Sequence, residues 1–161
     1  MSKDEISYQI LYRYYLEKLY STLTRRVDNV LSFALVFLGI GVTLNVGGPF
    51  ILGPGVVGIF ILKIVFRFGT RSTQADRQSR AWLKLFNTQH RFPSDKTLFL
   101  TITSLEQDAS EVWSMLIGPA IVMTETALGE TPIKPLTAGE KLCAFLSGAT
   151  KPQPSSHDGR K

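Results

Sequence analysis

The 161-residue sequence has one cysteine, Cys143, and two histidines, His90 and His157. A single cysteine excludes an internal disulfide and is typical of a reducing compartment. The sequence also lacks a His/Glu metal-binding helix, a serine nucleophile elbow and a Walker loop. We therefore predict no catalytic residue, no metal site and no cofactor, and we do not expect an enzyme.

Charge is absent from Asn29 to Leu62, a run of 34 residues. A bilayer core about 30 Å thick accommodates roughly 20 apolar residues per helix, so this run is too long for one span and suits two short ones. Gly47-Gly48-Pro49 and Gly53-Pro54-Gly55 supply backbone angles that turn a chain. The sequence predicts an all-α membrane protein built on a two-span transmembrane helical hairpin.

Residues 53–58 read GPGVVG and match the G-x-G-x-x-G spacing of dinucleotide-binding proteins. That motif binds a pyrophosphate only where a strand enters the glycine turn and an amphipathic helix leaves it. The uncharged surroundings fit neither element. We interpret these glycines as part of the hairpin.

Basic residues flank the uncharged run on both sides. Lys18, Arg25 and Arg26 precede it, four arginines follow it at positions 67, 71, 77 and 80, and the connection 45–55 has none. Because basic flanks stay in the cytoplasm, both termini are expected there. No small-residue cleavage site is obvious after the first span, so the spans are expected to stay in the mature protein.

The rest of the chain is predicted to be helical. A capping-box spacing at Ser2–Glu5, without glycine or proline up to Leu38, predicts a first helix that could exceed forty residues. Residues 70–89 are expected to prolong the second span into the cytoplasm, and Pro93 ends that helix. We divide the chain into 1–91, an acidic helical region 92–149 and a tail 150–161.

The acidic region is predicted to hold three short helices. Ser94-Asp95 can cap a helix that contains Leu98, Ile102 and Leu105. The apolar patch 112–123 is short and contains Gly118-Pro119, so a buried, kinked helix is favoured over a third span. Thr137 and Glu140 form a second capping-box pattern before a last helix.

Two patterns in the first helix have two interpretations each. All five tyrosines lie at positions 8, 12, 14, 15 and 20, and they either pack against a neighbouring helix or stack on bases. Small or weakly polar residues recur at helical spacing and either pack tightly against another helix or line a pore; this stripe is Ser32, Val36, Gly39 and Thr43. Packing is favoured in both cases. Lys63, near the end of the second span, is expected to snorkel towards water.

A basic collar follows the second span. Residues 67–91 carry six basic groups against one acidic group, whereas 92–149 carry three lysines against seven carboxylates. Four of the basic residues lie close to one helix face: Arg77, Arg80, Lys84 and Arg91. Arg80 lies roughly 21 Å beyond Phe66 along a helix, far outside a Debye length of about 8 Å, so topology does not explain it. Either the acidic region neutralises this face or a phosphate-bearing ligand binds it.

The order of these parts resembles the SLATT family of two-span bacterial effectors. The resemblance rests on YRYYLEKLYSTLTRR, on the two closely spaced spans and on FRFGTRSTQADRQSRAWLKLFNTQ, and it covers roughly residues 6–90. It implies a homo-oligomer, a tetramer being one candidate, in the bacterial inner membrane. It also implies a nucleotidyltransferase as the source of a nucleotide signal.

The sequence and the resemblance together predict an effector of antiphage defence. It would be an ion channel that opens or closes when a nucleotide or oligonucleotide binds on its cytoplasmic side, with Arg77, Arg80, Lys84 and Arg91 as ligand-binding residues. The alternatives are a non-conducting membrane anchor for a cytoplasmic partner and a phage membrane-lesion protein.

Overall fold

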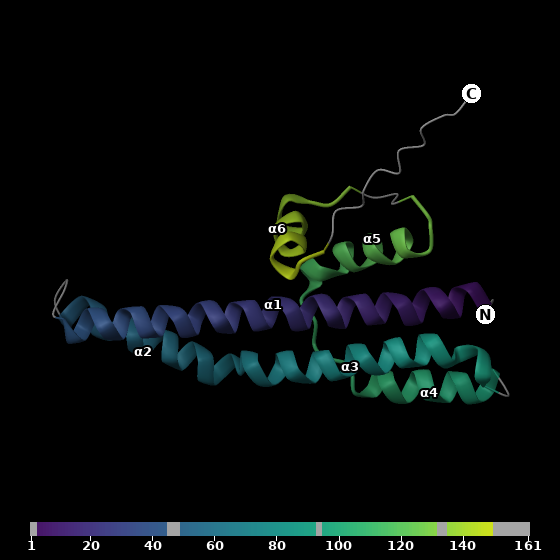
Figure 1. The fold of residues 1–161 in the computed structure, drawn as a ribbon, viewed down its shortest axis with the longest axis horizontal. Helices are drawn as coiled ribbons and strands as arrows, with labels where there is room; N and C mark the ends of the chain where they lie inside the picture. The colour runs from purple at the N-terminus through teal and green to yellow at the C-terminus, as the bar shows by residue number, and fades with distance from the viewer. Residues whose placement is uncertain (1–2, 45–48, 93–94, 132–134, 150–161) are drawn as a thin grey trace, which may run out of the picture.

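The computed structural model describes residues 3–44, 49–92, 95–131 and 135–149. Within these ranges the ordered elements are all helical: α1 Lys3–Thr43, α2 Pro49–Phe66, α3 Phe68–Thr88, η1 Gln89–Arg91, α4 Asp95–Gln107, η2 Ser114–Leu116, α5 Ile117–Ala127 and α6 Ala138–Ser147. α1 spans most of the length of the molecule (Figure 1). The other helices pack along it, and the α1–α3 contact is the most extensive.

The predicted long first helix is confirmed, since α1 is 41 residues long. Its N-terminal capping box involves Ser2, which lies outside the described residues. From Asn29 onwards α1 runs beside α2, and together they form an elongated end that we call the apolar hairpin (29–44 and 49–66; Figure 1). The helical body consists of the first part of α1, up to Asp28, and the helices α3 to α6. α1 and the helix pair α2–α3 are long and apolar enough to cross a membrane.

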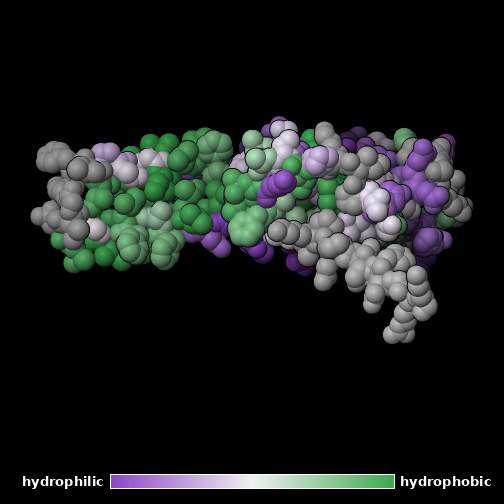
Figure 2. Space-filling model, turned by 90° about the horizontal axis from the view of Figure 1, so that it is seen from above, coloured by the Kyte–Doolittle hydropathy of each residue, from purple (hydrophilic) through white to green (hydrophobic). Residues whose placement is uncertain are grey.

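The two ends of the molecule differ in surface character. Hydrophobic colour covers the hairpin end, and hydrophilic colour increases towards the opposite end (Figure 2). Large apolar side chains on the hairpin are exposed, including Phe33, Phe37, Phe60 and Ile64. In water this surface would be unfavourable, because contiguous apolar patches of this size mark contacts with membrane or protein.

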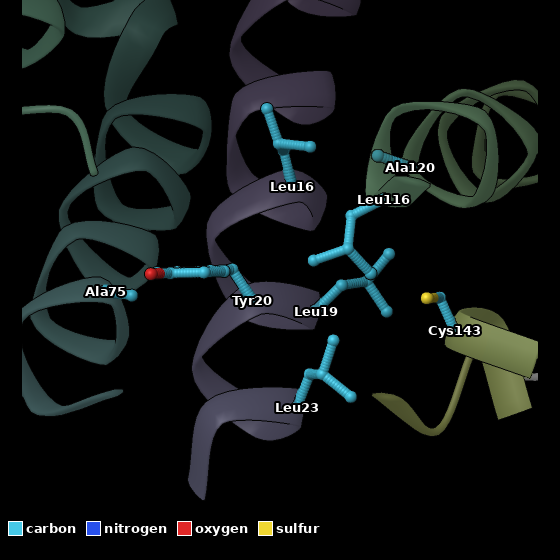
Figure 3. Close-up of a cluster of buried hydrophobic side chains, with 8 residues drawn as sticks. All are labelled: Leu16, Leu19, Tyr20, Leu23, Ala75, Leu116, Ala120 and Cys143. Atoms are coloured by element: carbon cyan, nitrogen blue, oxygen red, sulfur yellow. The ribbon is translucent and has the colours of Figure 1, made fainter. Parts of the chain in front are cut away.

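The helical body has two apolar clusters, both built on α1. The first joins α1 to α3, η2, α5 and α6 through Leu16, Leu19, Tyr20, Leu23, Ala75, Leu116, Ala120 and Cys143 (Figure 3). The second joins α1 to α3 and α4 through Ile10, Leu11, Tyr14, Trp82, Leu85, Leu98 and Ile102. Residues 95–149 thus share both cores with the first ninety residues.

The turn prediction at Gly53-Pro54-Gly55 is wrong. These residues lie inside α2, which already begins at Pro49, and the connection therefore falls before them. Proline at the first position of a helix loses no helical hydrogen bond. Pro54 removes one such bond near the start of the helix, but two packed apolar helices still tolerate it.

The second span does not continue straight into α3. Arg67 separates α2 from α3 and has a left-handed backbone with φ 47° and ψ 42°. Backbone hydrogen bonds still bridge the break, from Arg67 to Lys63 and from Arg71 to Arg67. The stacked rings of Phe66 and Phe68, with centroids 5.3 Å apart, flank it. The left-handed backbone of Arg67 therefore separates α2 from α3.

The predictions for the acidic region are largely confirmed. α4 carries Leu98 and Ile102 into the second cluster, while its proposed cap at Ser94 lies outside the described residues. Thr137 and Glu140 form both bonds of a capping box at the start of α6. The patch 112–123 is not the single kinked helix that we predicted, because it holds η2 and the start of α5, and Pro119 lies in the first turn of α5.

Candidate functional site: basic face, groove and hairpin junction

The basic face lies on the outer side of α3. Arg77, Arg80 and Lys84 are exposed, whereas the opposite side of the helix buries Ala75, Trp82 and other residues against α1. Spacings of three and four residues place the three basic side chains on one face. Arg91 falls on the 3-10 turn η1, so it lies beyond α3 and does not continue its register.

The acidic region pairs with α1 and leaves the basic face largely free. Glu106 accepts hydrogen bonds from Arg13 at 3.0 Å and from Gln9 at 3.2 Å. Among the described residues, no ion pair joins Arg77, Lys84 or Arg91 to a carboxylate. Arg80 pairs with Asp76 on its own helix at 2.9 Å, but its side chain is 78% exposed. Exposed pairs of this kind contribute only about 0.3–0.5 kcal/mol and yield readily to a ligand.

A polar groove lies beside Arg77. Its volume is about 700 Å³, and its lining is Gly69, Thr70, Thr73, Gln74, Arg77, Gln78 and Asp108. This is within the range of sites for small ligands, roughly 300–1,000 Å³. Of the four predicted ligand-binding residues, only Arg77 lines this groove; Arg80, Lys84 and Arg91 do not.

Sequence reasoning missed the other polar residues of the groove. Thr70, Thr73, Gln74 and Arg77 follow one another at helical spacing, and this polar stripe was a usable signal. Gln78 is held in place because its amide nitrogen donates to the Leu105 carbonyl at 2.5 Å. Asp108 comes from the segment after α4, and no local pattern places it there.

An ion pair joins the two helices of the apolar hairpin at its junction with the helical body. The Lys63 ammonium lies 3.1 Å from an Asp28 carboxylate oxygen and donates to the Ser32 hydroxyl. Both charged side chains are 26% exposed. Lys63 thus has a charged partner on the neighbouring helix, Asp28, which no sequence pattern indicated; its expected snorkelling towards water stays a prediction.

The predicted small-residue stripe divides at this junction. Ser32 faces α2 through its bond with Lys63, whereas Val36 and Thr43 are exposed. A Cβ added at Gly39 would have no atom within 4 Å. The outer three members therefore take no part in packing within the described chain.

The tyrosines pack in the helical body. Tyr14 and Tyr20 are buried, and Tyr12 and Tyr15 lie at the edge of the first cluster. Burial is the main cause that raises the pKa of Tyr8, Tyr12 and Tyr15. Tyr8 lines a cavity with Asp4, Glu5 and Glu130, where negative charge disfavours a nucleotide. The packing interpretation is supported over base stacking.

Glu17 is a buried carboxylate of α1 that sequence reasoning did not find. One oxygen accepts from the Ser110 backbone N–H at 2.8 Å, and the other has no hydrogen-bond partner. Burial raises the pKa of Glu17, and the bonds from Ser110 and the charge of Arg13 oppose this effect. The residue ties the segment before η2 to α1.

Comparison with protein-family models, curated proteins and solved structures gives no match to this chain. The resemblance to two-span effectors thus rests on the order of parts alone. Among the described residues, no group of histidine, cysteine, aspartate or glutamate side chains is arranged to hold a metal ion.

Proposed function

We propose that the chain inserts its apolar hairpin into the bacterial inner membrane and assembles with copies of itself into an ion channel. Two short helices cannot enclose a pore within one chain, whereas several hairpins can. Val36, Gly39 and Thr43 offer a surface for this contact, since small residues let helix backbones approach closely in lipid. Both termini and the helical body would lie in the cytoplasm.

The proposed channel responds to a nucleotide or oligonucleotide bound at the basic face. The observation that carries this step is that Arg77 and Lys84 are exposed on one face and, among the described residues, form no ion pair, while Glu106 of the acidic region is engaged by Arg13. Phosphate groups bind such faces through charge, and repetition of the face around a symmetry axis strengthens the local field. The groove beside Arg77 is large enough to receive part of a nucleotide.

The resemblance supports a role in antiphage defence, in which a nucleotidyltransferase makes the signal and the channel is the output.

A non-conducting anchor is the second candidate. Phe99 and Leu100 on α4 favour it, because both are exposed at the far end of the body, where a cytoplasmic partner could bind.

The experiment is electrical recording of purified protein in planar bilayers, with nucleotides and short oligonucleotides added on one side. We expect current that changes with ligand. We expect Arg77→Ala/Lys84→Ala to lose this response, while the control Lys96→Ala, at an exposed lysine of α4 outside the basic face, keeps it. Binding of a single-stranded oligonucleotide is measured separately at several salt concentrations. Each lost phosphate contact should lower the slope of log binding constant against log salt concentration by roughly 0.7. Absence of current together with a demonstrated partner protein would establish the anchor instead.

A further inference from the structure

The helix α6 presents an exposed apolar face. Leu142, Phe145 and Leu146 lie at helical spacing i, i+3 and i+4, and all three are exposed, Phe145 to 78%. The opposite face buries Cys143 and Ser147 in the helical body. Lys141 is exposed beside this apolar face. A helix with this division has the character of a surface-bound amphipathic helix.

Arg26 fixes the C-terminal end of α6 close to the start of the apolar hairpin. Its guanidinium donates to the Leu146 carbonyl at 2.8 Å and to the Phe145 carbonyl at 3.4 Å. Arg26 precedes Asn29 by three residues, or roughly 4.5 Å along the helix axis. The last turn of α6 is therefore held at the edge of the hairpin.

The orientation of α6 fits a position at the membrane surface. α6 runs across α1, whereas α5 runs along it (Figure 1). Cys143 lies beside Leu19 and Leu23, further towards the hairpin than Ala120 of α5 (Figure 3). If α1 crosses the bilayer steeply, α6 lies nearly in the membrane plane.

The hairpin is shorter than a bilayer core is thick, which places the membrane surface close to α6. From Asn29 to Thr43, α1 rises roughly 22 Å, whereas a bilayer core is about 30 Å thick. The difference, roughly 8 Å, brings the cytoplasmic headgroup region to the level of Arg25 and Arg26, which stay outside the hydrocarbon core. Pairing of Lys63 with Asp28 lowers the cost of placing both charges in this zone.

We propose that α6 is an interfacial helix that inserts Leu142, Phe145 and Leu146 into the cytoplasmic leaflet of the bilayer. This inference rests on the proposed membrane insertion of the hairpin. Lipid is the favoured occupant because the apolar face of α6 lies beside the apolar surface of the hairpin, which lipid would already cover. Lys141 then lies at headgroup level, where anionic lipids attract it. The insertion would couple the helical body to the membrane surface.

The test uses three matched single-cysteine variants in a Cys143→Ala background. Phe145→Cys reports on α6, Phe60→Cys on the hairpin and Phe99→Cys on α4; the last two phenylalanines are 57% and 59% exposed. Each purified full-length variant carries an NBD label and is reconstituted into vesicles of phosphatidylcholine and phosphatidylglycerol. Nitroxide-labelled lipids then quench the label according to its depth. Leu142→Cys serves as a second reporter on α6, and circular dichroism checks the helix content.

We expect lipid quenching at positions 60 and 145 to be several-fold greater than at 99, with position 145 about 5–10 Å below the headgroups. Quenching at 60 but not at 145 or 142 would overturn the proposal for α6 while leaving the membrane insertion of the hairpin intact. A blue-shifted but unquenched label at 145 would also overturn it, because a protein surface would then cover α6. Absence of quenching at 60 would refute the insertion of the hairpin, and the inference with it.

Discussion

The two halves of α1 carry similar apolar side chains but differ in whether these side chains are buried. Before Val27, its apolar side chains point at α3, α4 and α5 and are buried, as Ile10, Leu19 and Leu23 show. After Asn29, residues of the same character stay exposed on most sides, as Val30, Phe33 and Phe37 show. One continuous helix thus passes from a protein core to a surface suited to lipid. The change comes at Asp28, which binds Lys63 across the hairpin.

The largest expected change in stability comes from comparing one substitution in the buried half of α1 with one in the apolar hairpin. Leu19→Ala removes a buried side chain from the first cluster and should lower the free energy of unfolding by about 2–5 kcal/mol. Leu62→Ala removes a side chain that is exposed in the described chain and should cost much less. Denaturant unfolding in mild detergent, followed by tryptophan fluorescence, measures both. Equal losses would show that the hairpin is packed as tightly as the body.

The ion pair at the junction should give the next largest effect. Asp28→Ala leaves Lys63 without its carboxylate at the edge of the apolar region, and we expect a loss of about 1–2 kcal/mol, because the pair is partly exposed. Asp28→Ala/Lys63→Ala should recover part of the loss. A double-mutant cycle from melting curves measures the coupling. Strictly additive losses would indicate that the two charges do not interact.

Glu17 should make the stability of the helical body depend on pH. Since burial raises its folded pKa, the folded state holds a proton that the unfolded state releases, and stability should fall as pH rises from about 4.3 through the folded pKa. Glu17→Gln should remove this dependence and gain up to about 1–2 kcal/mol at pH 7. Below pH 4 the variant and the parent should melt alike. An unchanged pH profile in the variant would contradict this account.

Two glycines of the hairpin separate contacts between chains from contacts within one chain. A Cβ added at Gly39 has no atom of its own chain within 4 Å, so we expect Gly39→Leu to change oligomer size or conductance through a neighbouring subunit. A Cβ at Gly41 would lie 3.2 Å from the Leu52 side chain, so Gly41→Leu should disturb the hairpin itself. Native mass spectrometry of the solubilised complex distinguishes them. No effect from Gly39→Leu would remove this stripe as an interface.

Arg80→Ala should have the smallest effect on stability. Its pair with Asp76 is exposed and lies within one helix, so the cost should be about 0.3–0.5 kcal/mol. Binding of an oligonucleotide should nevertheless weaken to a similar degree for different sequences. A melting curve beside a binding isotherm at two salt concentrations separates the two readouts. A large loss of stability with unchanged affinity would favour a structural role.

Local patterns predicted most of the fold. The length of α1 followed from the absence of glycine and proline up to Leu38, and the cap of α6 followed from Thr137 and Glu140. The break at Arg67 carried no such signal, because an arginine rarely adopts a left-handed backbone. Pro119 was misjudged because a proline in the first turn does not bend a helix, whereas Pro54 lies inside α2 and is tolerated although it removes one helical hydrogen bond.

The candidate site was less predictable because it depends on register between distant segments. The spacing of Arg77, Arg80 and Lys84 placed them on one face, and their exposure agrees with this. The partners of Glu17 and Glu106 lie more than ninety residues away along the chain, at Ser110 and Arg13. No pattern in the sequence determined that Lys63 would meet Asp28.

The division of the chain into a membrane hairpin and a cytoplasmic body is tested most directly by labelling from one side. In a Cys143→Ala background, Leu44→Cys lies at the far end of the exposed hairpin and Arg80→Cys lies on the exposed basic face. An impermeant maleimide is added to intact spheroplasts and, separately, to permeabilised ones. The account predicts that position 44 reacts in both and that position 80 reacts only after permeabilisation. Reaction of position 80 in intact spheroplasts, with position 44 protected, would contradict it.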